Sequence, residues 1–70
     1  MSAVRFVSGG YEIDVTPEVL PDRRYVARAV VTRLADRKVE EIWPDFEPFA
    51  TETEASSAAH LAAVAWISHQ

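Results

Sequence analysis

The sequence predicts an α+β fold, in which an antiparallel meander of three or four strands is followed by one C-terminal helix packed on one face. Two observations lead to this prediction. In the first half of the chain, apolar and polar residues alternate with a period of two, which is typical of strands that bury one face. Later, a helix-start signal at Thr51 is followed by an alanine-rich segment without glycine or proline, which favours a helix.

The first predicted element is a β-hairpin over residues 3–15. Apolar residues stand at alternate positions on both sides of the pair Gly9–Gly10. Glycine adopts the positive φ angles of a tight two-residue hairpin turn without steric cost, so this pair predicts the turn. The sequence leaves open whether the hairpin joins the main sheet.

Residues 16–24 form the next segment, which contains Pro17 and Pro21. Asp22 follows the second proline, and aspartate is common in turns. Because proline has no backbone N–H and cannot donate to a β-ladder, we expect a long connection here rather than a strand.

Two further strands are predicted after this connection. Residues 25–34 form the longest β-favouring run, and its even-numbered residues from 26 to 32 have mixed polarity and are expected to face water. Residues 39–43 form a short strand that Pro44 ends. We expect Phe46 and Phe49 to close the edge of the core. The predicted core face of the longer strand consists of Tyr25, Ala27, Ala29 and Val31.

The predicted helix begins with a capping box. Thr51 and Glu54 have the spacing at which the threonine hydroxyl accepts from the glutamate amide and the glutamate carboxylate accepts from the threonine amide. Helix propensity then extends the helix to about Ser68. At about 100° per residue, Ala63 and Ile67 lie on the far side of this helix. The stripe expected to face the sheet consists of Ala55, Ala58, Ala59, Ala62, Ala65 and Trp66, widened by Leu61 and Val64.

Length and composition restrict the class of protein. A chain of 70 residues can fill one hydrophobic core, so we expect a single domain over residues 1–70. The longest uncharged stretch, residues 55–70, is interrupted by polar side chains, so no membrane span is expected. The absence of cysteine excludes disulfides and thiolate chemistry. The N-terminus lacks the features of a signal peptide, which predicts a cytoplasmic protein.

Charge is distributed unevenly along the chain. All seven cations and five of the acids lie within residues 1–38, which carry a net charge of +2, whereas the remainder carries −6 and the whole chain −4. An acidic protein repels a phosphate backbone, so we expect no nucleic-acid partner. The alternative interpretation is a basic strand with Tyr25 for base stacking, although Arg28 and Arg33 have opposite parity and would not share a face. Its candidate nucleic-acid contacts are Arg23, Arg24, Arg28 and Arg33.

Few side chains indicate catalysis or metal binding. His60 and His69 are nine residues apart, so on one helix they point about 180° away from each other and cannot chelate a common ion. We expect His60 on the wet face and His69 near the C-terminal end of the helix dipole. The carboxylates of residues 40–54 are interpreted as a solubilising rim. We therefore expect no enzyme, no metal and no cofactor.

Two short segments resemble known families. Tyr25-Val26-Ala27-Arg28-Ala29, together with Phe49-Ala50-Thr51-Glu52-Thr53-Glu54-Ala55 and Ala58, looks like the sheet-plus-helix DNA-binding domains of phage integrase arms and plant ethylene-response factors. This resemblance covers roughly residues 23–62 and implies a sheet that enters the major groove, but Glu40 and Glu41 stand where those domains are basic. Gly9-Gly10-Tyr11 with the later helix is similar to HicB-type antitoxin domains, which bind a toxin through a comparable sheet; their proline-rich loop does not match residues 16–24. Both resemblances suggest a small bacterial domain of unknown function.

The helix predicts self-association. Apolar residues run nearly all the way around the helix, while one sheet face covers about half of a helix. The remaining apolar side chains therefore require another surface to cover them. We expect a non-enzymatic, homodimeric protein-interaction domain that dimerises through the helix or the adjacent sheet edge; an unidentified protein partner is also open. The alternative to dimerisation is a monomer whose far helix face exposes only scattered alanines. The alternative is a nucleic-acid-binding or antitoxin-like regulator. The candidate interface residues are Ala59, Ala63, Trp66 and Ile67.

Overall fold

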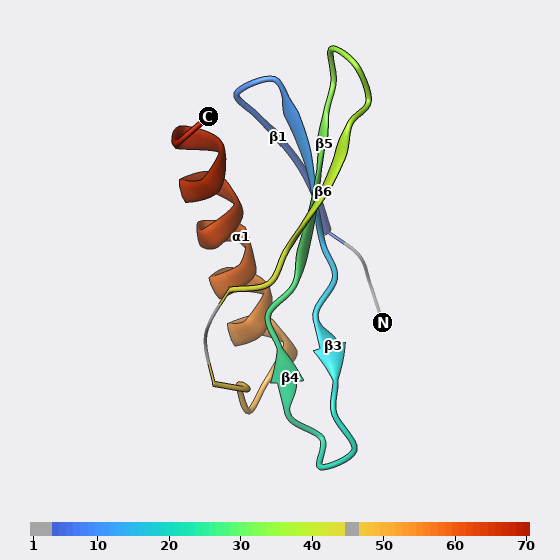
Figure 1. Cartoon of the computed structure of the whole chain (residues 1–70). Coiled ribbons are helices and arrows are strands. Elements are labelled where there is room, and N and C mark those ends of the chain that lie inside the picture. The colour runs from blue at the N-terminus through green and yellow to red at the C-terminus, as the bar shows by residue number, and fades with distance from the viewer. Residues whose placement is uncertain (1–3, 45–46) are drawn as a thin grey trace.

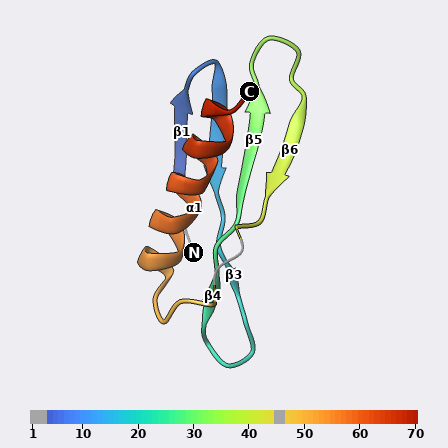
Figure 2. The ribbon, with the colours of Figure 1, turned by 60° about the vertical axis from the view of Figure 1, so that its left-hand side comes forward.

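The computed structural model describes residues 4–44 and 47–70. Four strands form an antiparallel sheet in the order β1-β2-β5-β6, and the helix packs across one face of it (Figures 1 and 2). The predicted α+β fold is confirmed, and the first hairpin joins the main sheet. The elements are β1 (Val4–Ser8), β2 (Tyr11–Val15), β3 (Glu18–Val19), β4 (Tyr25–Val26), β5 (Ala29–Arg33), β6 (Val39–Ile42) and α1 (Glu52–Ser68). In the part of the chain that the structure describes, no helix has the length and apolar character needed to cross a membrane.

The turn between β1 and β2 is the predicted glycine turn. Gly9 has a φ of 55° and Gly10 a φ of 82°, and Ser8 faces Tyr11 directly across the two-residue loop. Positive φ at both central positions characterises the turn whose twist matches that of a hairpin. The two glycines therefore determine the register of the first hairpin.

The prediction of a long connection over residues 16–24 is wrong, because β3 lies within it and pairs with β4. The β3–β4 pairing continues the register of the β2–β5 pairing. Between these two ladders, the Thr16 amide donates to the Arg28 carbonyl at 3.1 Å. Successive amides of a strand point to opposite sides, so the nitrogen of Pro17 faces away from this ladder. The missing N–H of proline removes no bond here, and the hairpin extends beyond the main sheet (Figure 1).

The predicted strand over residues 25–34 is divided into β4 and β5. Its predicted core face is confirmed at Ala27, Ala29 and Val31, which are buried. Thr32 lies on the opposite face but is only 8% exposed, so this position does not face water as expected. In the sheet it lies between Glu12 on β2 and Val39 on β6, which flank it from both sides.

The helix bounds agree with the prediction. Thr51 is the N-cap, and its hydroxyl accepts from the Glu54 amide at 3.2 Å. The second bond of the predicted capping box differs, because the Glu54 carboxylate accepts from the Thr51 hydroxyl at 3.0 Å. Two acids, Glu52 and Glu54, lie in the first turn, where negative charge stabilises the positive end of the helix dipole.

The buried face of the helix is narrower than the predicted stripe. Ala55, Ala59 and Ala63 are fully buried, whereas Leu61 is 70% exposed and Ala65 is also exposed. The prediction that placed Ala63 on the far side of the helix is wrong, and Ile67 also packs against the core. Residues four apart line one edge of a helix, and small alanine side chains let that edge lie close to the sheet.

The core is small. Its largest fully buried side chains are Ile13, Val15 and Val31, and the other buried hydrophobic residues are alanines. Aromatic residues seal its borders: Tyr11 meets Trp66 edge to face, with ring centroids 5.7 Å apart. Phe49 packs against the core as predicted, while Phe46 lies outside the described residues.

Candidate functional site

The face of the four-stranded sheet opposite α1, here called the open face, carries alternating apolar and charged side chains. Val7 is 68% exposed and Val39 57% exposed on its two outer strands. Trp43, just after β6, is 49% exposed and lies on the same side of the sheet. The strand register places on this face Arg5, Val7, Glu12, Asp14, Val30, Thr32, Val39 and Glu41.

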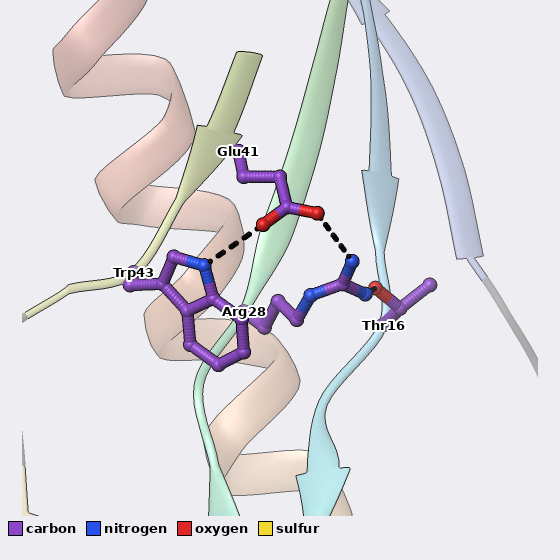
Figure 3. A network of polar contacts seen from close by, with 4 residues as sticks. All are labelled: Thr16, Arg28, Glu41 and Trp43. Atoms are coloured by element: carbon purple, nitrogen blue, oxygen red, sulfur yellow. Dashed lines mark hydrogen bonds and ion pairs between the residues drawn. The ribbon is translucent and has the colours of Figure 1, made fainter. Parts of the chain in front are cut away.

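One end of the open face holds a cluster of four polar and aromatic residues (Figure 3). The Arg28 guanidinium donates to the Thr16 hydroxyl at 2.6 Å and to the Glu41 carboxylate at 3.0 Å. The indole N–H of Trp43 donates to the other Glu41 oxygen at 3.1 Å. The guanidinium carbon also lies 5.3 Å from the centroid of the Trp43 ring, within the range of a cation–π contact.

The hydrogen bonds and charges in this cluster favour the ionised form of Glu41. The hydrogen bond from Trp43, followed by the hydrogen bond and charge of Arg28, lowers the pKa of Glu41 below its ordinary value. Glu41 therefore stays ionised and keeps both donors in place at neutral pH. The cluster holds a half-exposed indole in a fixed position, which suits recognition of another surface.

Three of the four predicted nucleic-acid contacts, Arg24, Arg28 and Arg33, form ion pairs within the chain. Arg24 forms an ion pair with Asp22 at 2.7 Å, which lowers the pKa of Asp22. Arg33 lies 3.7 Å from Asp36. Arg28 is on the open face and Arg33 on the helix side, so their predicted opposite parity is confirmed. Arg23 stands apart at the tip of the β3–β4 hairpin, with a φ of 67°.

The predicted interface residues pack on the chain's own sheet. Ala59 and Ala63 are 0% exposed. Trp66 and Ile67 are half-buried against the same core. Ala59 and Ala63 consequently have no surface to offer to a second chain, because the sheet already covers them.

A cleft of about 280 Å³ lies between the first half of α1 and β1. Phe6 and Val15 line its sheet side, and Glu52, Ser56 and His60, spaced four residues apart, line its helix side. The His60 ring stacks on Phe6 with centroids 4.0 Å apart, so the prediction of His60 on the wet face is wrong. The spacing of four was the signal in the sequence that could have identified this cleft.

The chemistry available in the cleft is limited by its geometry. Among the described residues, no hydrogen bond joins the Ser56 hydroxyl to the His60 ring or the His60 ring to Glu52. A serine nucleophile needs such a bond to its base. The described residues also contain no group of three or more metal-ligating side chains.

Comparisons with known proteins identify no family for this chain. No protein-family model, no curated protein and no solved structure matches this chain. The resemblances to integrase-arm and HicB-type domains therefore stay predictions.

Proposed function

We propose that this chain is a cytoplasmic, non-enzymatic protein-interaction domain that works as a homo-oligomer. One observation carries the proposal: among the described residues, more large apolar side chains are exposed than are fully buried. The largest fully buried side chains are Ile13, Val15 and Val31. The exposed large hydrophobic residues are Val7, Val19, Leu34, Val39, Trp43 and Leu61.

The energetics of a small domain support association. Burial of apolar surface in a 70-residue chain is nearly cancelled by about 1.5 kcal/mol of conformational entropy lost per ordered residue. A partner that covers exposed apolar side chains adds burial without ordering more backbone. Oligomerisation is accordingly one of the ways in which domains of this size are stabilised.

The open face supports an interaction role in particular. Its charged groups bind one another, as in the contact of Arg28 with Glu41, so few unpaired charges would have to be desolvated on contact. Trp43 is held by Glu41 and Arg28, so it loses little side-chain entropy on binding. Tryptophan is also prominent among the residues that contribute most to protein interfaces.

The test of the proposal is the mass of the chain in solution. Light scattering and sedimentation equilibrium over a wide concentration range are expected to give at least twice the 7.8 kDa of the chain, with dissociation on dilution. A mass of one chain at the highest soluble concentration would refute self-association. In a Trp66→Phe background, in which Trp43 is the remaining tryptophan, emission followed on dilution gives an independent measure of whether the open face changes its exposure.

A further inference from the structure

The two edges of the main sheet differ in charge. β6 carries Glu40 and Glu41 side by side in a strand of four residues. The Arg33 amide donates to the Lys38 carbonyl, so Val39 and Glu41 have the outward backbone groups of β6. Antiparallel registers centred on Glu40 or Glu41 place a carboxylate opposite the partner's carboxylate, which is destabilising. A register centred on Val39 has to pair Glu41 with Arg37, which lies in the turn before β6 with a φ of 61°.

β1 carries one charge, Arg5, and its guanidinium is bound to Asp14 of the neighbouring strand at 2.9 Å. Charged residues protect an edge from pairing. Arg5 and Glu41 are each bound to a partner within the chain, but β6 carries the additional charge of Glu40, so β1 is the less protected edge.

The backbone of β1 has hydrogen-bonding groups that point away from the sheet. The Thr16 amide points toward β5, so the alternate residues Ile13 and Val15 of β2 point toward β1. Their partner Phe6 therefore bonds inward, and the N–H and C=O groups of Arg5 and Val7 point outward. Among the described residues, β1 has a strand partner on its β2 side only.

We infer that a second copy of this chain pairs antiparallel with the outer edge of β1, so that the two sheets join into one of eight strands. This inference rests on the self-association in the proposed function and places it at the β1 edge, which leaves the open face uncovered. With Phe6 on the two-fold axis, Arg5 lies opposite the partner's Val7, and Val7 opposite the partner's Arg5. Each of these two pairs exchanges both backbone hydrogen bonds.

Neighbouring registers are less favourable. Moving the two-fold axis by one residue shifts the register by two. With the axis at Arg5, Arg5 lies opposite the partner's Arg5, which sets two like charges face to face. A shift in the other direction places Val7 opposite the partner's Val7 and moves Arg5 opposite the partner's Gly9, which lies in the turn beyond β1. The register centred on Phe6 uses every outward backbone group of Arg5 and Val7 and brings no like charges together.

The same arrangement completes the cleft between α1 and β1. Phe6 of β1 and Val15 of β2 line its sheet side, and neither β5 nor β6 contributes to it. A two-fold axis perpendicular to the sheet at Phe6 leaves both helices on the same side of the joined sheet. The two clefts then face each other across the axis, and the partner's α1 forms the second wall of one continuous groove.

Cysteine cross-linking tests the interface, because the chain contains no cysteine. An equimolar mixture of Val7→Cys and Arg5→Cys chains is expected to form a disulfide-linked dimer on mild oxidation, because facing residues of antiparallel strands lie within disulfide range. Each variant alone is expected to cross-link much less. Leu61→Cys on α1 and Val39→Cys on β6, whose residues are similarly exposed, are matched controls that are expected to stay unlinked.

A charge variant supplies a second measurement. Val7→Lys places a cation opposite the partner's Arg5 twice in each dimer, so we expect the dissociation constant to rise roughly two- to thirty-fold. Within its own chain the new cation faces Glu12, which favours the fold, so weaker association would not reflect unfolding. Leu61→Lys is the control and is expected to leave the dissociation constant unchanged.

The outcomes separate this inference from the proposed function. An unaltered chain that stays monomeric overturns both. A dimer that cross-links through Val39→Cys or Leu61→Cys, or whose dissociation constant is unaffected by Val7→Lys, overturns the β1 interface and leaves self-association in place. A dimer in which Val7→Cys alone or Arg5→Cys alone cross-links better than their mixture overturns the register centred on Phe6.

Discussion

Replacing Gly9 by alanine is expected to destabilise the chain more than the same replacement at Gly10. Both residues have positive φ, at 55° and 82°, and an L-residue in this conformation costs about 1–2 kcal/mol. The surroundings differ: a Cβ on Gly9 would lie 3.1 Å from Cγ2 of Ile67, whereas a Cβ on Gly10 would meet nothing within 4 Å. Of the two substitutions, only that at Gly9 brings a new methyl group against the last turn of α1.

The contact with Ile67 determines how much more Gly9→Ala costs than Gly10→Ala. Forcing a methyl group into an occupied position costs about 1–3 kcal/mol, and we take the lower end because Ile67 is half-buried near the end of α1. The expected losses are therefore about 1–2 kcal/mol for Gly10→Ala and about 2–3 kcal/mol for Gly9→Ala. For a chain of this size each kcal/mol lowers Tm by about 4–8 °C.

Urea unfolding at one fixed protein concentration, followed by far-UV circular dichroism, measures both variants. Ile67→Ala removes the Cγ2 atom, so in that background the two glycine variants are expected to cost the same. The reasoning is refuted if Gly9→Ala and Gly10→Ala are equally destabilising in the unaltered chain. It is also refuted if the difference between them persists beside Ile67→Ala.

Four further outcomes follow from the contacts described above. Thr51→Ala is expected to lower the free energy of unfolding by about 1 kcal/mol through loss of the N-cap, while Thr51→Ser keeps it; urea unfolding distinguishes the two. The pKa of Glu41 is lowered in the folded chain, so its contribution to stability is complete above the ordinary glutamate pKa of about 4.3 and is lost as pH falls through the lowered value. Glu41→Gln is expected to flatten that part of the profile of urea midpoint against pH, and an unchanged acid limb would contradict the assignment. Arg28→Met, which removes bonds to two partners, is expected to cost about 1 kcal/mol and to shift Trp43 emission, whereas Arg33→Met, whose ion pair is longer and half-exposed, is expected to cost close to nothing. Gel-shift titrations at low salt are expected to give no sequence-selective DNA complex, and a selective submicromolar complex would contradict the expectation that nucleic acid is not a partner.

Local signals in the sequence were sufficient for several elements. The Gly9–Gly10 turn, the Thr51 cap and the end of α1 near Ser68 were predicted and are confirmed. Each depends on residues within a few positions of one another: a φ preference, a hydroxyl near an amide, or the absence of a helix breaker. The alternation of residues 25–31 likewise predicted the buried face of β5, because side-chain direction in a strand has a strict period of two.

Other features were decided by which segments meet in space. Pro17 would have broken a ladder on one side of its strand, but β5 lies on the other side, and the local sequence does not contain that information. In an alanine-rich helix the sequence does not show which apolar residues are buried. The position of the sheet decides this, so Ala63 is buried and Leu61 is exposed.

In the candidate site, too, the local sequence indicates some features and the fold creates the others. The sequence marked Arg28 as a charged residue on one strand face, but its partners Thr16 and Glu41 lie 12 and 13 residues away. Only the register of β2, β5 and β6 brings these three side chains together, and only the packing of α1 on the sheet places His60 over Phe6. Short-range preferences determined the first hairpin turn and the two ends of α1, whereas contacts between distant segments depend on the closing of the whole chain around its core.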